Sequence, residues 1–331
     1  MTSTNGAATS GSARRFWLLG IGVAVVVALY TAAWFYGADR LKAIVRGQLS
    51  DASVAVACTG LDVRGYPFRI GVFCDSLGLD DSRTGTSASF GALRSAAQVY
   101  RPGHAILELD GPAQIRVAPE MSLVADWDLL HASVVAGTVG LERVSVAYDA
   151  LRGTFTPGMG RTGLTFTVRH GEVHTRENGD ALDAALSLHG LDLKVADTAV
   201  PSLDATLDLS IEGAAGWLAS GPPEDAPRGT KGELRRFGLD FGGGNTATLS
   251  GRYEIDDQGL LSGRFELKVN GIDTARDLVK RAYPEVADTA DSVTETIRAL
   301  SGGSDDASVR LKVDDGVVYL GFIPIAAIPP L

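Results

Sequence analysis

The stretch MSLVADWDLL, residues 121–130, has apolar side chains at every second position from Met121 to Leu129, and Ser122, Asp126 and Asp128 are among the residues between them. Successive side chains of an extended chain point to opposite sides, so Leu123 and Trp127 share one side with Met121, Ala125 and Leu129. Asp126 and Asp128 fall on the opposite side. A period of two with one apolar side is typical of a β-strand that buries one face and exposes the other to water. This stretch therefore predicts a strand of an antiparallel sheet.

The same alternation recurs along most of the chain. It is found in HAILELDG (104–111), PAQIRVAP (112–119), LERVSVAYDAL (141–151), LTFTVRHGEVHT (164–175), ALDAALSLHGLDLKV (181–195), LDATLDLSIEG (203–213), GELRRFGLDFGGG (232–244), NTATLSGRYEID (245–256) and LLSGRFELKVNG (260–271). Turn residues at 256–259 and 314–316 predict hairpins between neighbouring strands. The predicted fold is mainly β with a minor α part: an extended, curved antiparallel sheet that forms an open groove, with helices between 272 and 300 covering part of it.

An uncharged stretch, FWLLGIGVAVVVALYTAAWFY at 16–36, precedes the strands. At about 1.5 Å of rise per residue it is long enough to cross the roughly 30 Å hydrocarbon core of a bilayer. Trp17 at one end and Trp34–Tyr36 at the other are placed as interface anchors. We expect a disordered cytoplasmic tail at 1–15, a transmembrane helix at 16–36 and a membrane-proximal helix at 37–50. The alternative is a secretory signal cleaved after the small residues at 31–33.

Both cysteines of the chain flank one corner, CTGLDVRGYPFRIGVFC at 58–74. If Arg64 pairs with Phe68 around the loop, Cys58 lies directly opposite Cys74, within disulfide distance. Leu61 and Val63 then fall on the opposite face from Cys58, so we expect a bulge near residues 59–60 to restore them. A disulfide requires an oxidising compartment such as a bacterial periplasm, which would place residues 51–331 outside the cytoplasm. The alternative is a pair of buried free thiols in a reducing compartment.

Within 51–331 the Pro- and Gly-rich stretch ASGPPEDAPRGTKG, 219–232, predicts a flexible loop that divides the β-rich domain into two lobes. The last residues, VVYLGFIPIAAIPPL at 317–331, contain three prolines, which exclude a central strand. They predict an apolar, extended tail.

Three motifs together give the chain a family resemblance: GYPFRI at 65–70, LSGRFELKVNGID at 261–273 and DDGVVYLGFIPIAAIPPL at 314–331. With the N-terminal membrane segment, they resemble the bacterial family called domain of unknown function 2125 from about residue 34 to residue 331. The resemblance implies an uncharacterised envelope protein anchored in the inner membrane, and it carries over no catalytic residue. More loosely, the repeated amphipathic strands resemble AsmA-type envelope proteins, whose curled sheets are associated with phospholipid movement; this likeness concerns architecture alone.

Charge and motifs favour no catalytic chemistry. The net charge of −10 disfavours nucleic acid as a partner. His170 and His174, with His189 as a third ligand, are the nearest approach to a metal motif, but solvated histidines near a turn are the commoner explanation. The glycines at 242–244 precede a strand rather than a helix, so we expect a turn and not a phosphate loop. We therefore expect a protein without catalytic activity, cofactor or bound metal.

Apolar side chains on the predicted sheet are the remaining candidates for a site. The hydrophobic groove is predicted to involve Leu123, Trp127, Phe166, Leu188, Phe241, Phe265, Phe322 and Ile325. Ordinary packing in a core is the alternative for each of them. The expected role is the binding or handling of a lipid, or of another hydrophobic envelope component, by a single-pass inner-membrane protein with its N-terminus in the cytoplasm. A subunit that docks onto an envelope complex is the second hypothesis, and an envelope hydrolase is a weaker third.

Overall fold

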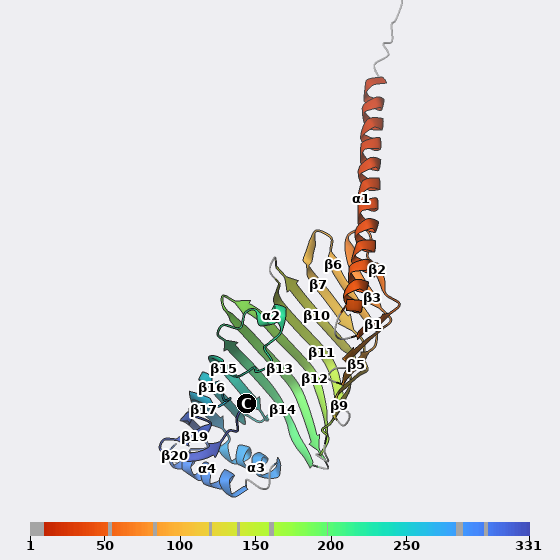
Figure 1. Cartoon of the computed structure of the whole chain (residues 1–331). Coiled ribbons are helices and arrows are strands. Elements are labelled where there is room, and N and C mark those ends of the chain that lie inside the picture. The colour runs from red at the N-terminus through yellow and green to blue at the C-terminus, as the bar shows by residue number, and fades with distance from the viewer. Residues whose placement is uncertain are drawn as a thin grey trace, which may run out of the picture.

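A computed structural model of the chain describes residues 10–51, 55–81, 85–118, 121–137, 140–158, 162–196, 198–282, 287–300 and 304–331. It shows a single antiparallel sheet with a long helix rising from one end and two short helices at the other end (Figure 1). The prediction of a mainly antiparallel sheet, with an apolar helix before it and helices near its C-terminal end, is confirmed. The sheet stays open rather than closing into a barrel.

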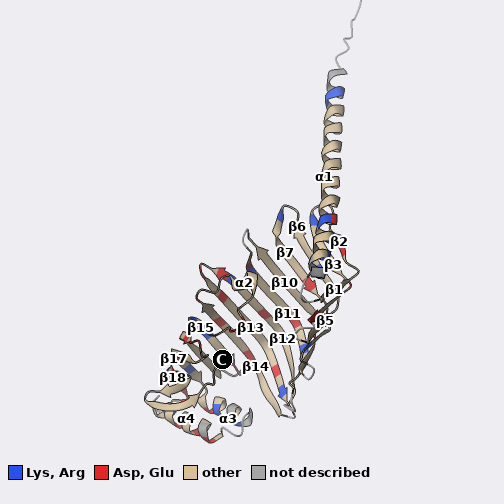
Figure 2. Ribbon diagram, in the orientation of Figure 1, with Lys and Arg blue, Asp and Glu red and all other residues tan. Residues whose placement is uncertain are grey.

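Helix α1, Ser10–Asp51, contains the predicted apolar span. Its segment Arg14–Gly47 is long and apolar enough to cross a membrane. Figure 2 shows an uncharged upper helix between a basic patch near its N-terminal end and the charged residues that appear where it meets the sheet. Residues 10–15 were predicted as part of a disordered tail and are helical, because nothing between Ser10 and Phe16 breaks the helix. Residues 1–9 lie outside the described part of the chain.

The first ten strands are halves of longer strands. Their bounds are β1 Ala55–Thr59, β2 Asp62–Arg64, β3 Arg69–Cys74, β4 Ser76–Asp81, β5 Thr86–Phe90, β6 Leu93–Gln98, β7 Arg101–Leu109, β8 Ala113–Ala118, β9 Met121–Asp126 and β10 Leu129–Ala136. The chain does not reverse between β7 and β8, since β7 pairs with β6 and β10 while β8 pairs with β5 and β9. The same holds for β1 with β2, β3 with β4, β5 with β6 and β9 with β10.

The later strands complete the sheet. They are β11 Leu141–Thr156, β12 Leu164–Asn178, β13 Ala181–Val195, β14 Thr198–Ile211, β15 Lys231–Asp240, β16 Thr246–Ile255, β17 Leu261–Asn270, β18 Asp306–Asp314, β19 Val317–Leu320 and β20 Ile323–Ala327. Each long strand pairs with the long strand before it and the one after it. The topology is therefore a simple meander, which hairpin-by-hairpin growth of an antiparallel sheet produces.

Interruptions of the ladder occur at matching places in successive strands. Gly60 and Gly190 adopt positive φ angles of 65° and 62°, and Ala150 does so at 52°. Backbone hydrogen bonds continue across the gaps, as from Asp75 N–H to the Thr59 carbonyl at 2.8 Å and from Gly91 N–H to the Asp110 carbonyl at 3.0 Å. A residue whose backbone dihedral angles lie outside the β region loses its partner in the neighbouring strand and bends its own strand. These interruptions form a bend line that crosses the sheet from β1 to β13.

Two clusters of buried residues lie on separate parts of the sheet. Helices α3, Ile272–Ala282, and α4, Ala287–Leu300, pack on the C-terminal strands, where Ile272, Ile297, Val309 and Leu320 are buried together. The second cluster centres on Ala113, Ala125 and Trp127 near the bend line. The ring N–H of Trp127 donates to the Leu109 carbonyl at 2.7 Å, which satisfies its polar group.

The segment 219–232 follows the short helix α2, Trp217–Ser220, and leads into β15. It contains turns at residues 224–229, and its two flanking strands, β14 and β15, pair directly with each other. The sheet is thus continuous across this segment. The division into two lobes and the flexibility of the loop remain predictions.

Candidate functional site: the apolar face of an open sheet

The strand register places apolar side chains in continuous rows on one side of the sheet. We call this side the apolar face and define it by three rows of directly opposed residues from β10 to β18. The rows are Leu130, Tyr148, Gly171, Leu188, Ala205, Leu239, Ala247, Val269, Ala307; Ala132, Val146, Val173, Leu186, Leu207, Phe237, Leu249, Leu267, Val309; and Val134, Val144, Thr175, Ala184, Leu209, Leu234, Gly251, Phe265, Leu311. Thr175 and the hydroxyl group of Tyr148 are the polar groups among them.

The middle of the apolar face is less covered than its two ends. Neither buried cluster contains a residue of β12 to β15, although α2 lies beside β11 and β12 and α3 approaches β14. Leu186 and Leu207 are half-buried, and Phe237 is 40% exposed. Apolar side chains in a sheet with a second packed layer are normally buried. The middle strands therefore present an apolar surface that the described chain covers only in part.

Most residues of the predicted groove lie on this side of the sheet. Leu188 and Phe265 belong to the rows, Trp127 packs with Leu130 of the first row, and Leu123 lies between Ile115 and Phe155 of the neighbouring strands. Phe166 is opposite Leu193 and Gly153, where its ring fills the space that a side chain on Gly153 would need.

The other three predicted groove residues lie at the C-terminal end of their strands or of the chain. Ile325 packs against the buried cluster under α3 and α4, so it belongs to a core. Phe241 follows β15, and its N–H closes the turn to β16 by donating to the Asn245 carbonyl at 2.9 Å. Phe322 is fully exposed in the turn between β19 and β20, where Gly321, with φ of 64°, ends the alternation of β19; its place in a groove stays a prediction.

The opposite side of the sheet is polar and carries hollows. One, of about 700 Å³, lies over β15 to β18 and is lined by Arg235, Arg264, Glu266, Arg310 and Lys312 among others. Within and beside it Arg252, Arg264 and Lys312 lie directly opposite one another on three adjacent strands. Like charges that are directly opposed in a sheet repel. This cationic row was not predicted, because it depends on strand register.

The histidines of the predicted metal motif point to this polar side and contact carboxylates. His170 Nδ1 lies 2.6 Å from an Asp149 oxygen, and His189 Nδ1 lies 2.9 Å from Asp204. His174 Nε2 lies 3.1 Å from Glu172. The Asp149 and Glu172 carboxylates raise the pKa of His170, because they stabilise its protonated form.

A metal site does not follow from these contacts. The rings of His170 and His189 stack with their centroids 6.3 Å apart, so the two histidines lie side by side on neighbouring strands. No group of three or more histidine, cysteine or acidic side chains suited to a metal ion occurs in the residues that the structure describes. The contacts form a polar belt next to the bend line.

A buried carboxylate stabilises the polar side of the middle strands. Asp183 accepts hydrogen bonds from Arg235 at 2.6 Å and from Arg176 at 3.0 Å, and its side chain is only 7% exposed. Burial opposes the ionisation of Asp183, but the two guanidinium groups outweigh it and lower its pKa to about 2. Asp208 also receives a bond from Arg235 at 3.0 Å. These groups tie β12 to β15 on the side opposite the apolar face.

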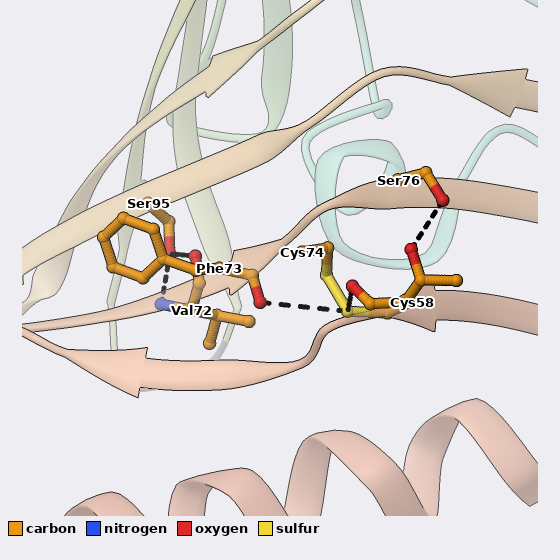
Figure 3. The surroundings of a disulfide bond; sticks show 7 residues. Cys58, Val72, Phe73, Cys74, Ser76 and Ser95 are labelled. Carbon is orange, nitrogen blue, oxygen red and sulfur yellow. Dashed lines mark hydrogen bonds between the residues drawn. A yellow bond between two sulfur atoms is a disulfide. The ribbon is translucent and has the colours of Figure 1, made fainter.

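The cysteine corner closes the membrane-proximal end of the sheet. Cys58 and Cys74 form a disulfide with 5.3 Å between their Cα atoms, as predicted (Figure 3). The predicted register is wrong, since Arg64 pairs with Gly71 rather than Phe68. The loop is wider because Arg69 N–H closes onto the Gly65 carbonyl at 2.9 Å.

The disulfide runs diagonally across the bend line. Cys58 is directly opposite Leu77 in the ladder, so the two cysteines are not cross-strand partners. The irregularity predicted near Thr59–Gly60 is present as the break between β1 and β2. Just before this break, the hydroxyl groups of Thr59 and Ser76 bond at 2.7 Å. Figure 3 shows Ser76 beside the disulfide. The covalent link thus joins two strand halves where the backbone ladder is interrupted.

The fold and its faces define a class of protein: a single open antiparallel meander with one apolar face, attached to a helix of membrane-spanning length. The chain belongs to the bacterial family described as "Uncharacterized protein conserved in bacteria (DUF2125)", whose model matches residues 34–329. No curated protein and no solved structure matches the chain.

Proposed function

We propose that this protein is a non-enzymatic, membrane-anchored lipid-binding protein of the bacterial envelope, and that its apolar face holds the acyl chains of a lipid. The observation that carries the proposal is the unbroken set of apolar rows across β10 to β18. In water such a surface is unfavourable unless something covers it, at about 25 cal/mol for each Å² of apolar area. A ligand with hydrocarbon chains supplies that cover.

The size of the surface suits an acyl chain. Between the two buried clusters the rows cross β12 to β15, which are three inter-strand steps. At about 4.8 Å for each step, this band is roughly 14 Å wide across the strands. Half of a bilayer's hydrocarbon core is about 15 Å thick. The width of the band therefore matches the length of one lipid tail, lying across the strands.

Compartment and orientation form part of the same proposal. We place α1 in the inner membrane as a single-pass anchor, with the sheet in the periplasm. The disulfide supports this placement, because disulfides persist in oxidising compartments. An anchor at one end of the sheet also supports a role in handling lipids, since it holds the apolar face next to a source of them.

The test compares two adjacent residues of β14 on opposite faces. Leu207→Glu puts a charge in the middle row, whereas the matched control Thr206→Glu puts the same charge on the polar side, opposite Gly238. Each full-length protein is extracted in mild detergent, and the phospholipid retained is counted by native mass spectrometry. We expect wild type and Thr206→Glu to retain lipid and Leu207→Glu to lose it. Absence of lipid from the wild-type protein, or equal retention by both variants, would refute the proposal.

A docking role is the second candidate, and one observation favours it. Strand β20 pairs only with β19 among the described residues, and at its start Ile323 is 56% exposed beside the fully exposed Phe322. A free sheet edge is a template on which another protein can add a strand. If the lipid-free full-length chain captures one defined envelope protein, and Ile323→Lys abolishes the capture, the docking role replaces the lipid-binding one.

A further inference from the structure

The corner between β2 and β3 is attached to α1 inside the apolar span of the helix. The Tyr30 hydroxyl donates to the Pro67 carbonyl, and the Thr31 and Tyr66 hydroxyl groups bond at 2.7 Å. One helical turn further on, the Trp34 ring N–H donates to the Arg69 carbonyl at 3.0 Å. These contacts fix the position of the corner along the helix axis.

Aromatic packing makes the attachment rigid. Tyr66 stacks on Phe35 at 5.7 Å between ring centroids and meets the edge of Trp34 at 5.5 Å. Trp34 is only 7% exposed although it belongs to the apolar span. The corner and this part of the helix therefore form one packed unit, and the corner has the same height relative to the bilayer as residues 30–35.

Two large aromatic side chains, one in this unit and one in a neighbouring turn, are largely exposed. Phe68 is 70% exposed in the corner, and Tyr100 is 71% exposed in the turn between β6 and β7. The two turns are neighbours, because Val99 N–H donates to the Phe68 carbonyl at 3.1 Å. Figure 1 shows both turns at the end of the sheet nearest the emerging helix.

The height of the corner places these rings at the edge of the hydrocarbon. Tyr30 lies six residues before Tyr36, the last residue of the uncharged stretch, which is roughly 9 Å along a helix. The headgroup layer on each side of a bilayer is about 5–8 Å thick. Exposed arginines, Arg69 and Arg101, flank the two rings and are placed to meet lipid phosphates. Aromatic side chains with neighbouring basic groups are typical of this boundary.

We propose that Phe68 and Tyr100 insert into the boundary between headgroups and hydrocarbon of the membrane that α1 crosses. The sheet then has a second membrane contact beside its anchor. This contact resists tilting of the sheet relative to the bilayer and holds the first strands against the lipid surface. The inference rests on the anchoring part of the proposed function and is independent of lipid binding by the apolar face.

The test measures the depth of single labelled sites in the full-length protein. Phe68→Cys is labelled with an environment-sensitive nitrobenzoxadiazole maleimide, which the bridged native cysteines do not take up. The protein is reconstituted into phosphatidylcholine–phosphatidylglycerol vesicles that contain lipids with a nitroxide either near the headgroup or deep in the tail. The matched control is Phe322→Cys, another exposed phenylalanine in a turn, on the last strand pair. Val26→Cys, in the apolar span, reports the anchor.

We expect the Phe68 label to lose most of its fluorescence to the shallow nitroxide and less to the deep one. The Phe322 label should keep its fluorescence with both, and the Val26 label should be quenched most by the deep nitroxide. A Phe68 label that behaves like the Phe322 label, while the Val26 label is quenched, overturns this inference and leaves the anchor standing. If the Val26 label is not quenched, the anchor fails and the inference fails with it. A Tyr100→Cys label repeats the test on the second turn.

Discussion

Removal of the Cys58–Cys74 disulfide should destabilise the membrane-proximal end of the sheet by an amount that the structure allows us to work out. The bridge closes a loop with a sequence separation of 16 residues. In the chain-entropy model, a loop of that length contributes about 3 kcal/mol at 25 °C. For a large domain each kcal/mol corresponds to about 2 °C in Tm, so we expect the Cys58→Ser/Cys74→Ser variant to melt roughly 6 °C lower than the wild-type protein.

The loss should be concentrated in the first strands. The disulfide joins strand halves at the break between β1 and β2, where the ladder has no residue pair at Gly60 or Leu61. Amides of β1 to β4 should therefore exchange with deuterium faster in the double variant. Amides of β16 and β17, at the other end of the meander, should keep their wild-type rates, because opening is local when the broken contact lies near one end.

The measurement is a thermal melt of the full-length protein in detergent, with and without a reducing agent. Reductant should lower the Tm of the wild-type protein to that of the double variant and leave the variant unchanged. The reasoning is refuted if the wild-type Tm does not respond to reductant while thiol labelling shows that the bridge has opened. It is also refuted if the variant is less stable than the reduced wild-type protein, since the serines would then destabilise by another route.

Three further changes test other contacts. Asp183 has a folded-state pKa of about 2 against a usual 3.8, so its ionised form stabilises the fold by about 2 kcal/mol above about pH 4, and this contribution is lost as the pH falls towards 2. Over this pH range the urea midpoint of the wild-type protein should therefore fall more than that of Asp183→Asn. Equal falls in the two urea midpoints would contradict the assignment. Arg264→Gln removes the charge that lies between Arg252 and Lys312, and it should raise the free energy of unfolding by about 0.2–1 kcal/mol at low salt. Added salt should reduce this gain. A loss of stability in calorimetry would contradict repulsion among these three side chains. Ile297→Ala, at a side chain of α4 that is only 7% exposed, should cost about 2–5 kcal/mol in denaturant titrations, and a cost below 1 kcal/mol would argue against a packed cluster there.

Alternation of side chains predicted the sheet and its apolar side but not the path of the first strands. The stretches 104–111 and 112–119 were predicted as two successive strands of the antiparallel sheet, without a prediction of their neighbours. The structure shows β7 and β8 in line, with a bend between them. Turn residues disrupt a ladder whether or not the chain reverses, so the outcome depends on which neighbours the two halves meet. Those partners are distant in sequence, and local pattern carries no information about them.

The C-terminal residues show the same limit. The prolines of 317–331 predicted an extended tail, and they do exclude a central strand. Yet Ile323–Ala327 forms the edge strand β20, in which Pro324 lies opposite Tyr319. An edge strand tolerates proline, because a missing N–H on its free side costs no ladder bond. A segment that contains proline can therefore pair with a neighbouring strand if the proline nitrogen, which lacks an N–H group, faces away from that strand.

Site residues were predictable where only the face mattered. Leu123, Trp127, Leu188 and Phe265 follow from a period of two within one strand. The cationic row and the ties of Asp183 require the register between strands, which bulges shift by one residue at several points, including the one between Asp208 and Leu209. Docking of the corner on α1 depends on hydroxyl and carbonyl groups that no sequence pattern brings together.

The meander explains why one face can stay apolar without a second layer. Each long strand pairs with the strands that precede and follow it in the chain. The connections between strands are therefore not forced to cross either face of the sheet. The polar side gains stability from ion pairs such as Arg235–Asp183, so the middle strands are held together without a core on the apolar side. Helices α3 and α4 cover the apolar face at the C-terminal strands, and α1 occupies the other end of the sheet. An apolar surface bounded in this way has its widest free part between the two ends, which is where a lipid tail would lie in the proposed function.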